Sequence, residues 1–323
     1  MEFPRPNIVV SKCLNFCKCR YNGQKLYSKF IEFFKDYMNF YPVCPEVEIG
    51  LGVPRTPVRI IQQEDKEYLK NSDTGEDYTE KMNSFSESFL NNLKDIDGFI
   101  LKSRSPTCGI KDVKKYKNTG KVPPMNDKTT GFFASKAKNK FPKAAFEDDG
   151  RLTNFSIREH FLIKIYTLAK FRQIKKSNKM KYLIKFHQNN KYLFMSYSQN
   201  ILNKLGKIVS NHEKLDIQKV LNRYEEELNN IFSKYRKEGR NINAFLHMFG
   251  YFSDKLTKEE KDYFQNQIEF YKNDMVPLSV LTAVLKSWVI RFDNDYLKNQ
   301  TILNPYPDSL IKVTDSGKGR EFR

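Results

Sequence analysis

The chain is organised around one stretch, ILKSRSPTCG at residues 100–109, which directly follows Asp97-Gly98-Phe99. Its apolar start predicts a short strand, and its polar end predicts a loop that carries hydroxyls, a thiol and two cations. Open α/β sheets place their chemistry in such loops, beyond the carboxyl ends of the strands. We expect Gly109 to permit a positive φ and the close approach of a ligand. Taken alone, Cys108 is interpreted more simply as a buried structural thiol.

The other cysteines change that interpretation. All five lie in the first third of the chain, at Cys13, Cys17, Cys19, Cys44 and Cys108. The odd count, and the lack of a signal-peptide pattern or a long apolar run, predict a cytoplasmic protein that binds a metal or cluster rather than one with disulfides. Three of the cysteines each stand after or beside a predicted strand, so a parallel sheet would bring them to one edge. Three thiolates suit an iron–sulfur cluster or zinc, although the spacing by itself is a weak signal.

The first half of the chain alternates between strand and helix signals. Strands are predicted at residues 6–11, 58–61 and 98–101, and helices at 25–41, 78–93 and 130–140. Residues 64–80 are predicted to form an exposed excursion, and the Lys-rich residues 112–128 a mobile loop beside the site. This alternation indicates an α/β domain with a mainly parallel sheet.

Four motifs of this half resemble the thiouracil desulfidase (TudS-like) family. They are VVSKCL at residues 9–14, RYNG at 20–23, VCPEVEIGLGVPR at 43–55 and SRSPTCG at 103–109. The resemblance implies a Rossmann-like domain over residues 1–152, holding a [4Fe-4S] cluster through Cys13, Cys44 and Cys108. It further implies that Glu46 is the catalytic acid and base and that Ser105, or else Thr107, supplies a catalytic hydroxyl. Cys17 and Cys19 are expected to be bystander thiols, unless Cys19 lies near, or even at, the cluster.

The chemistry can also be argued from the residue types. An iron that lacks a protein ligand is a soft Lewis acid for a thiocarbonyl sulfur, while Glu46 would activate a water molecule. Arg20, Arg55 and Arg104 would neutralise cluster charge or hold a phosphate, unless they form ordinary ion pairs.

Beyond Thr153 the periodicity is helical throughout, which predicts an all-α region. Residues 153–180 are expected to form a helical linker, 181–313 an all-helical domain, and 314–323 a disordered tail. The domain resembles the YbgA-like helical domain through FH at 186–187, KYLFM at 191–195, HMFGYF at 247–252 and NPYP at 304–307. Fusions of these two domains resemble bacterial desulfidases that act on 4-thiouridine in tRNA.

Charge is consistent with a nucleic-acid partner. The chain has 56 Lys and Arg against 38 Asp and Glu, a net charge of +18, most of it in the second half. The candidate phosphate contacts are four cations of one predicted helix: Lys170, Arg172, Lys175 and Lys176.

The sequence therefore predicts non-redox conversion of a thiolated pyrimidine, most specifically 4-thiouridine in tRNA, to uridine and sulfide. Two alternatives stay open: an enzyme of free thiouracil or thiouridine, and a non-enzymatic metal-containing RNA-binding protein. No membrane partner is expected.

Overall fold

The computed structural model of the protein describes residues 2–312. The described chain divides into two compact units, one formed by residues up to Ala169 together with those from Ser309 onward, the other by Lys170–Asp308. The predicted tail at 314–323 lies outside the described residues. Within residues 2–312, the helices are too short or too polar to cross a lipid bilayer.

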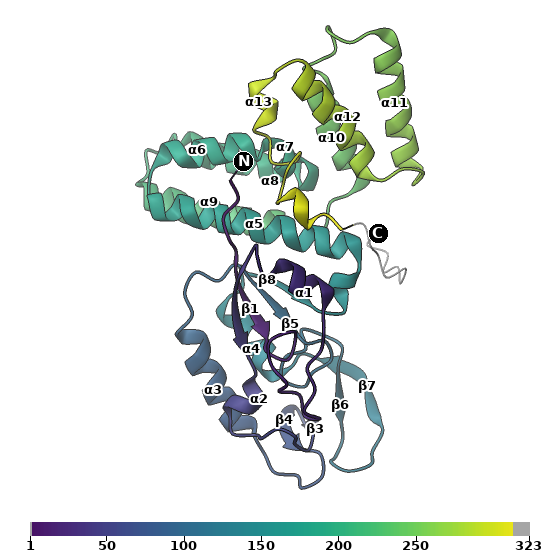
Figure 1. The fold of residues 1–323 in the computed structure, drawn as a ribbon. Coiled ribbons are helices and arrows are strands. Elements are labelled where there is room, and N and C mark those ends of the chain that lie inside the picture. Colours follow the sequence, from purple (N-terminus) through teal and green to yellow (C-terminus); the bar gives the residue numbers. More distant parts are fainter. Residues whose placement is uncertain (1, 313–323) are drawn as a thin grey trace. The chain divides into compact units, whose positions relative to one another are not determined.

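A four-stranded parallel sheet with the order β2-β1-β5-β8 forms the centre of the first unit (Figure 1). Its strands are β1 (Asn7–Ser11), β2 (Asn39–Val43), β5 (Gly98–Leu101) and β8 (Ala145–Asp148). Every residue of β1 and β5 is buried, as is usual for the inner strands of a parallel sheet. The loops that follow β2, β1 and β5 therefore meet at one edge of the sheet.

A second sheet lies in the same unit, and the sequence analysis did not predict it. Its order is β4-β3-β6-β7, with β3 (Val58–Gln63), β4 (Lys66–Asn71), β6 (Val113–Tyr116) and β7 (Pro124–Thr129). β3 runs antiparallel to β4 and parallel to β6, and β6 runs antiparallel to β7. The predicted excursion at 64–80 thus contains a strand, and the predicted loop at 112–128 is largely a hairpin. Both predictions were wrong because this strand pairing comes from partners distant in the sequence.

Helices connect the strands of the first unit: α1 (Lys29–Phe34), α2 (Pro45–Glu48), α3 (Thr79–Asn91) and α4 (Phe132–Lys140). The predicted helix at 25–41 was too long, because its last residues begin β2. That strand is an edge strand, which tolerates the missing N–H of Pro42. A core of apolar side chains, Ile60, Leu69, Phe99 and Phe133 among them, joins both sheets to α3 and α4.

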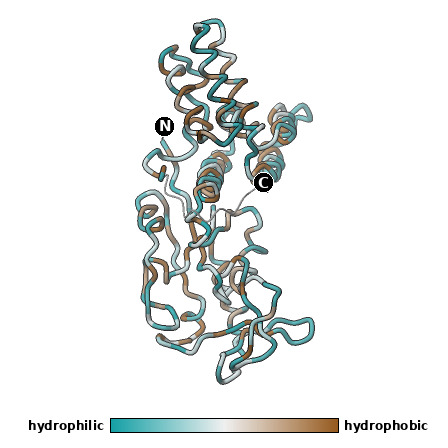
Figure 2. The backbone as a smooth tube through the Cα atoms, turned by 90° about the vertical axis from the view of Figure 1, so that its right-hand side faces the viewer, coloured by the Kyte–Doolittle hydropathy of each residue, from teal (hydrophilic) through white to brown (hydrophobic). Residues whose placement is uncertain are grey.

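The rest of the described chain is helical, as predicted. The helices are α5 (Phe155–Ser177), α6 (Met180–Asn189), α7 (Lys191–Tyr197), α8 (Gln199–Ser210), α9 (Ile217–Ile231), α10 (Glu238–Phe249), α11 (Lys258–Lys272), α12 (Leu278–Arg291) and α13 (Asp295–Lys298). Hydrophobic and hydrophilic bands alternate along them (Figure 2), and aromatic side chains such as Phe171, Tyr224 and Phe264 fill the interior. The fold class is therefore α/β followed by all-α.

Candidate active site

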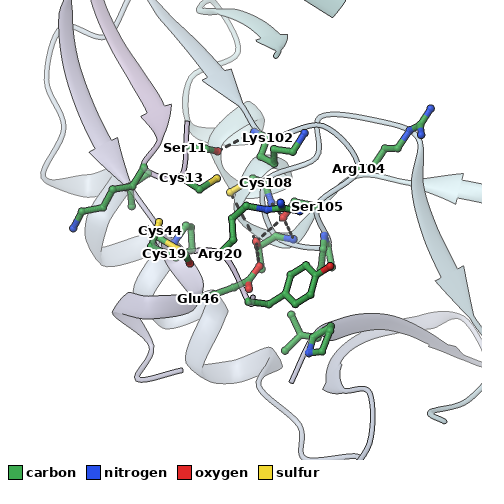
Figure 3. Close-up of a pocket in the computed structure, with 18 of the residues that line it drawn as sticks. Ser11, Cys13, Cys19, Arg20, Cys44, Glu46, Lys102, Arg104, Ser105 and Cys108 are labelled. Atoms are coloured by element: carbon green, nitrogen blue, oxygen red, sulfur yellow. Dashed lines mark hydrogen bonds between the residues drawn. The ribbon is translucent and has the colours of Figure 1, made fainter. Parts of the chain in front are cut away.

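Four thiols line one cavity of about 290 Å³ at the carboxyl edge of the parallel sheet (Figure 3). Cys13 follows β1, Cys44 directly precedes α2, and Cys108 lies in the loop after β5. Cys19 is the fourth and is 3% exposed. Cys17 is not among the residues that line this cavity, which we call the thiol cavity. The structure thus brings the three predicted ligands, Cys13, Cys44 and Cys108, together. Of the two remaining cysteines, Cys19 lines the same cavity and Cys17 does not.

The thiols interact with one another and are shielded from water. The hydrogen bond with Cys13 is the main cause that raises the pKa of Cys19 to about 12. The hydrogen bond with Cys19, and then burial, raise the pKa of Cys44 well above its usual range. Burial raises the pKa of Cys108 to about 12. The thiols of Cys19, Cys44 and Cys108 are therefore neutral at pH 7 in the protein alone. A bound cation would be required to hold them as thiolates.

The loop that carries Cys108 is fixed by close contacts with α4. The backbone N–H groups of Phe132 and Ala134 donate to the carbonyls of Pro106 and Thr107, at 3.1 Å each. A Cβ at Gly109 would lie 2.4 Å from the side chain of Val113 and 2.8 Å from a backbone oxygen, so a side chain does not fit. We expected a positive φ at Gly109, but in this loop Arg104 has the positive φ instead. Gly109 is needed because atoms of Val113 and Ser105 approach it closely, and not for its φ; the expected close approach of a ligand stays a prediction.

Glu46 is held on both carboxylate oxygens. Its Oε2 accepts from the Arg55 guanidinium at 2.6 and 3.0 Å, and its Oε1 accepts from the Thr107 hydroxyl at 2.8 Å. Both side chains of the Arg55 pair are nearly buried, at 8% and 13% exposure. A short, nearly buried pair in which two guanidinium N–H groups donate to one carboxylate oxygen fixes the carboxylate more firmly than a surface ion pair does. Glu46 is therefore pre-positioned at the wall of the thiol cavity.

A chain of hydroxyls leads to this carboxylate. The Oγ atoms of Ser105 and Thr107 are 3.0 Å apart. Because Thr107 donates its proton to Glu46, it can only accept from Ser105, so the order of donation is Ser105 to Thr107 to Glu46. The Ser105 oxygen also accepts from the backbone N–H groups of Thr107 and Cys108, at 3.3 and 3.1 Å. Sequence reasoning left Ser105 and Thr107 as alternatives for one role, whereas the structure gives them consecutive places.

The three arginines singled out from the sequence, Arg20, Arg55 and Arg104, differ in their surroundings. Arg55 also donates to the carbonyls of Cys19 and Gly52, at 3.1 Å each, so its donors are used within the protein. Arg20 lines the thiol cavity and lies over the ring of Tyr21. Arg104 lines the rim, and its side chain points away from the thiols (Figure 3). Arg20 and Arg104 are thus the cations available to a ligand.

The donor set of the thiol cavity is chemically suited to an iron–sulfur cluster. Among residues 2–312, no three His, Cys, Asp or Glu side chains are arranged to hold one metal ion. The thiols instead surround a space of about 290 Å³, and cysteine thiolates are the usual protein ligands of iron–sulfur clusters. The residues present therefore fit the predicted cofactor.

The four predicted cations of the second half lie on α5, in the helical unit and not at the thiol cavity. Lys170 is exposed, whereas Lys175 forms an ion pair with Glu225 at 2.9 Å. The assignment of Lys170, Arg172, Lys175 and Lys176 to nucleic-acid contacts stays a prediction.

Comparison with known proteins matches each half separately. The family model "2-thiouracil desulfurase" covers residues 8–149. The uncharacterized protein YbbK of Bacillus subtilis strain 168 is 35% identical over 109 residues, which are 32% of this chain and 72% of YbbK. The chain belongs to the 2-thiouracil desulfurase family.

Outside the desulfurase region, the family model "Protein of unknown function (DUF1722)" covers residues 191–307. The uncharacterized protein YbgA of Escherichia coli K12 is 23% identical over 158 residues, 48% of this chain and 93% of YbgA. A solved structure, described as a [4Fe-4S]-dependent thiouracil desulfidase, TudS, is matched with a TM-score of 0.37 and 22% identity, over 46% of this chain and 93% of that one. The predicted fusion of a desulfurase domain with a YbgA-like domain is confirmed.

Proposed function

We propose that this desulfurase-family protein converts 4-thiouridine in tRNA to uridine, with release of sulfide. The observation that carries the proposal is the meeting of Cys13, Cys44 and Cys108 with the hydrogen-bonded Glu46 in one cavity. The net charge of +18 supports a polyanionic substrate. The reaction exchanges a C=S bond for a C=O bond with water as the co-reactant, so it requires no net transfer of electrons.

Each residue of the cavity has a role in this proposal. Cys13, Cys44 and Cys108 would hold a [4Fe-4S] cluster, which supplies a soft Lewis acid for the thiocarbonyl sulfur. Glu46 would accept the proton of the attacking water and later return a proton to the leaving sulfur. Arg55 positions Glu46 through its two bonds to Oε2. Ser105 and Thr107 would pass a proton along their hydrogen bonds to Glu46, or would only donate a hydrogen bond to its Oε1 atom. In either case they keep the carboxylate oriented.

The test is anaerobic purification followed by incubation with tRNA that contains 4-thiouridine and, separately, with free 4-thiouridine. We expect iron and acid-labile sulfide in the protein, loss of the thiopyrimidine absorbance and a stoichiometric release of sulfide. Turnover of the free nucleoside without turnover of tRNA would assign the protein to small thiopyrimidines instead.

Two cysteine variants provide a matched pair for this test. Cys108→Ala should lose the iron and all turnover, because one of three ligands is missing. Cys17→Ala should keep both, because Cys17 does not line the thiol cavity. Full iron content and activity in Cys108→Ala would contradict the proposed ligand set.

A further inference from the structure

The second sheet carries a feature that the reaction does not explain, namely an unequal distribution of charge between its two faces. Its four strands contain only two carboxylates, Glu67 and Asp127. Both pair with Lys115, which is directed to the core side, where its ammonium also contacts Gln62 at 3.0 Å. On the core side of the sheet, one cation thus lies between two carboxylates, all three from its own strands.

The opposite face has no carboxylate from the four strands, and cations and aromatic rings lie on it beside Ile61 and Gln63. The register places Arg59 opposite Lys70, and Ile61 opposite both Tyr68 and Tyr116. Because side chains alternate along a strand, five cations and two tyrosines share this face. They are Arg59, Lys66, Lys70, Lys114 and Lys128, with Tyr68 and Tyr116. We call these seven residues the basic sheet face.

Two of these cations stand directly opposite each other. Lys114 and Lys128 are cross-strand partners, and both are exposed. Like charges placed directly opposite destabilise a sheet, so a pair that has no carboxylate nearby on its face is better explained by an external anion. Of the five cations, Lys70 has a carboxylate neighbour, Asp77 at 3.9 Å, and the turn residues Glu64 and Asp65 lie at the end of the hairpin. The face as a whole keeps a strong positive charge.

The rings on this face are presented beside the cations. The guanidinium of Arg59 lies 4.6 Å from the ring centre of Tyr116, and the ammonium of Lys70 lies 5.0 Å from that of Tyr68. Both rings are half-buried around Ile61, which is 1% exposed. Aromatic rings on the surface of a sheet, flanked by cations, combine base stacking with phosphate contacts.

The face also begins at the active site. Pro57 and Val58 line the thiol cavity, and Val58 is the first residue of β3. Arg59, the next residue, already belongs to the basic sheet face. A strand of nucleic acid on this face would therefore lie close to the cavity that receives a base.

We propose that the basic sheet face binds single-stranded RNA next to the reacting nucleotide, so that the desulfurase unit itself contacts the polynucleotide. The inference rests on the proposed function for its substrate class, but it concerns a different surface from the thiol cavity and from the cations of α5.

The test compares two charge reversals in the full-length protein. The variant Lys114→Glu/Lys128→Glu changes the basic sheet face. The control Lys94→Glu/Lys140→Glu makes the same change in net charge at two exposed positions outside it. Binding of a fluorescein-labelled oligouridine of about 12 nucleotides is measured by anisotropy at several salt concentrations.

We expect the Kd of the sheet variant to rise at least about tenfold near 0.1 M salt, and its salt slope to fall by about 1.4, the value for two lost phosphate contacts on a single strand. The control should change Kd by less than about twofold. Equal weakening in both variants would overturn the proposal, because only general charge would then matter. The milder Lys66→Gln/Lys114→Gln should weaken binding in the same direction if the reversal harms folding.

A third variant, Tyr68→Leu/Tyr116→Leu, keeps an apolar cover over Ile61 but removes the stacking rings. It should raise Kd about tenfold with an unchanged salt slope, because stacking releases no counterions. An unchanged Kd would overturn the assignment of the rings.

Turnover of free 4-thiouridine separates this proposal from the proposed function. It should be the same in all these variants and in the unsubstituted protein, because the thiol cavity is untouched. RNA binding that depends on the face, without any conversion of 4-thiouridine in tRNA, would refute the proposed function and keep the surface. If both charge reversals leave the conversion of tRNA unchanged, the proposed function would be kept and the basic sheet face would be refuted as the RNA-binding surface.

Discussion

Thr107 is the residue on which the geometry of the active site depends most. It is 1% exposed, and its hydroxyl is the link between Ser105 and Glu46. Thr107→Val keeps the shape of the side chain but breaks the link, so we expect kcat on free 4-thiouridine to fall by about 10²-fold with an unchanged KM and iron content. Ser105→Ala should cause a similar loss.

A double variant, Ser105→Ala/Thr107→Val, tests whether the two hydroxyls act as one unit. Its kcat should match that of Thr107→Val alone, because Thr107→Val already removes the link to Glu46, so the further loss of the Ser105 hydroxyl should have no additional effect. Losses that multiply would show two independent roles and contradict the order of donation.

At this scale, the sequence predicted which residues gather but not how they are connected. Motif resemblance and strand ends were sufficient to place Cys13, Cys44, Cys108 and Glu46 in one cavity. The sequence left Arg55 either as a cation for the cluster or a phosphate or as part of an ordinary ion pair, because no local pattern pairs Glu46 with a residue nine positions later.

Among the elements, the contact between the Cys108 loop and α4 determines how rigid the site is. A Cβ at Gly131 would lie 2.6 Å from the backbone carbon and oxygen of Thr107, atoms that cannot move independently. Gly131→Ala should therefore lower the free energy of unfolding by about 1–3 kcal/mol and reduce kcat. The matched control is Gly239→Ala in α10, where nothing lies within 4 Å of the added methyl group. It should raise the free energy of unfolding by about 0.5–1 kcal/mol in urea denaturation.

Elements with local signals were predicted well, and elements that depend on distant partners were not. The helices α3 and α4 follow from a 3.6-residue period, and β1 and β5 from short apolar runs. β6 and β7 have the composition of a solvated loop, because their outer face is basic and their inner polar groups are satisfied only when the sheet is assembled, as Lys115 is by Glu67 and Asp127. The basic outer face that made these strands resemble a loop in the sequence is also the observation that suggests their function.

For the whole molecule, stability should depend on pH through the helical unit. His187 bonds the hydroxyl of Tyr224 at 3.1 Å, and burial, with a smaller contribution from the charge of Lys191, lowers its pKa from 6.5 to about 4. The unfolded chain therefore takes up a proton as the pH falls through 6.5, whereas the folded protein does not until about pH 4. The contribution of His187 to the free energy of unfolding is fully present above pH 6.5 and is lost as the pH falls from 6.5 to 4.

This dependence can be measured with the single tryptophan of the chain, Trp288, which lies in α12 and so reports on the helical unit alone. Between pH 7 and pH 5, the free energy of unfolding followed by Trp288 fluorescence in urea should fall by about 2 kcal/mol more in the unsubstituted protein than in His187→Gln. Glutamine can still bond the Tyr224 hydroxyl but has no proton to gain, so the difference isolates the titration of His187. Identical pH profiles for the two proteins would mean that His187 reaches water in the folded state, and that the helical unit is packed less tightly around Tyr224 than the structure shows.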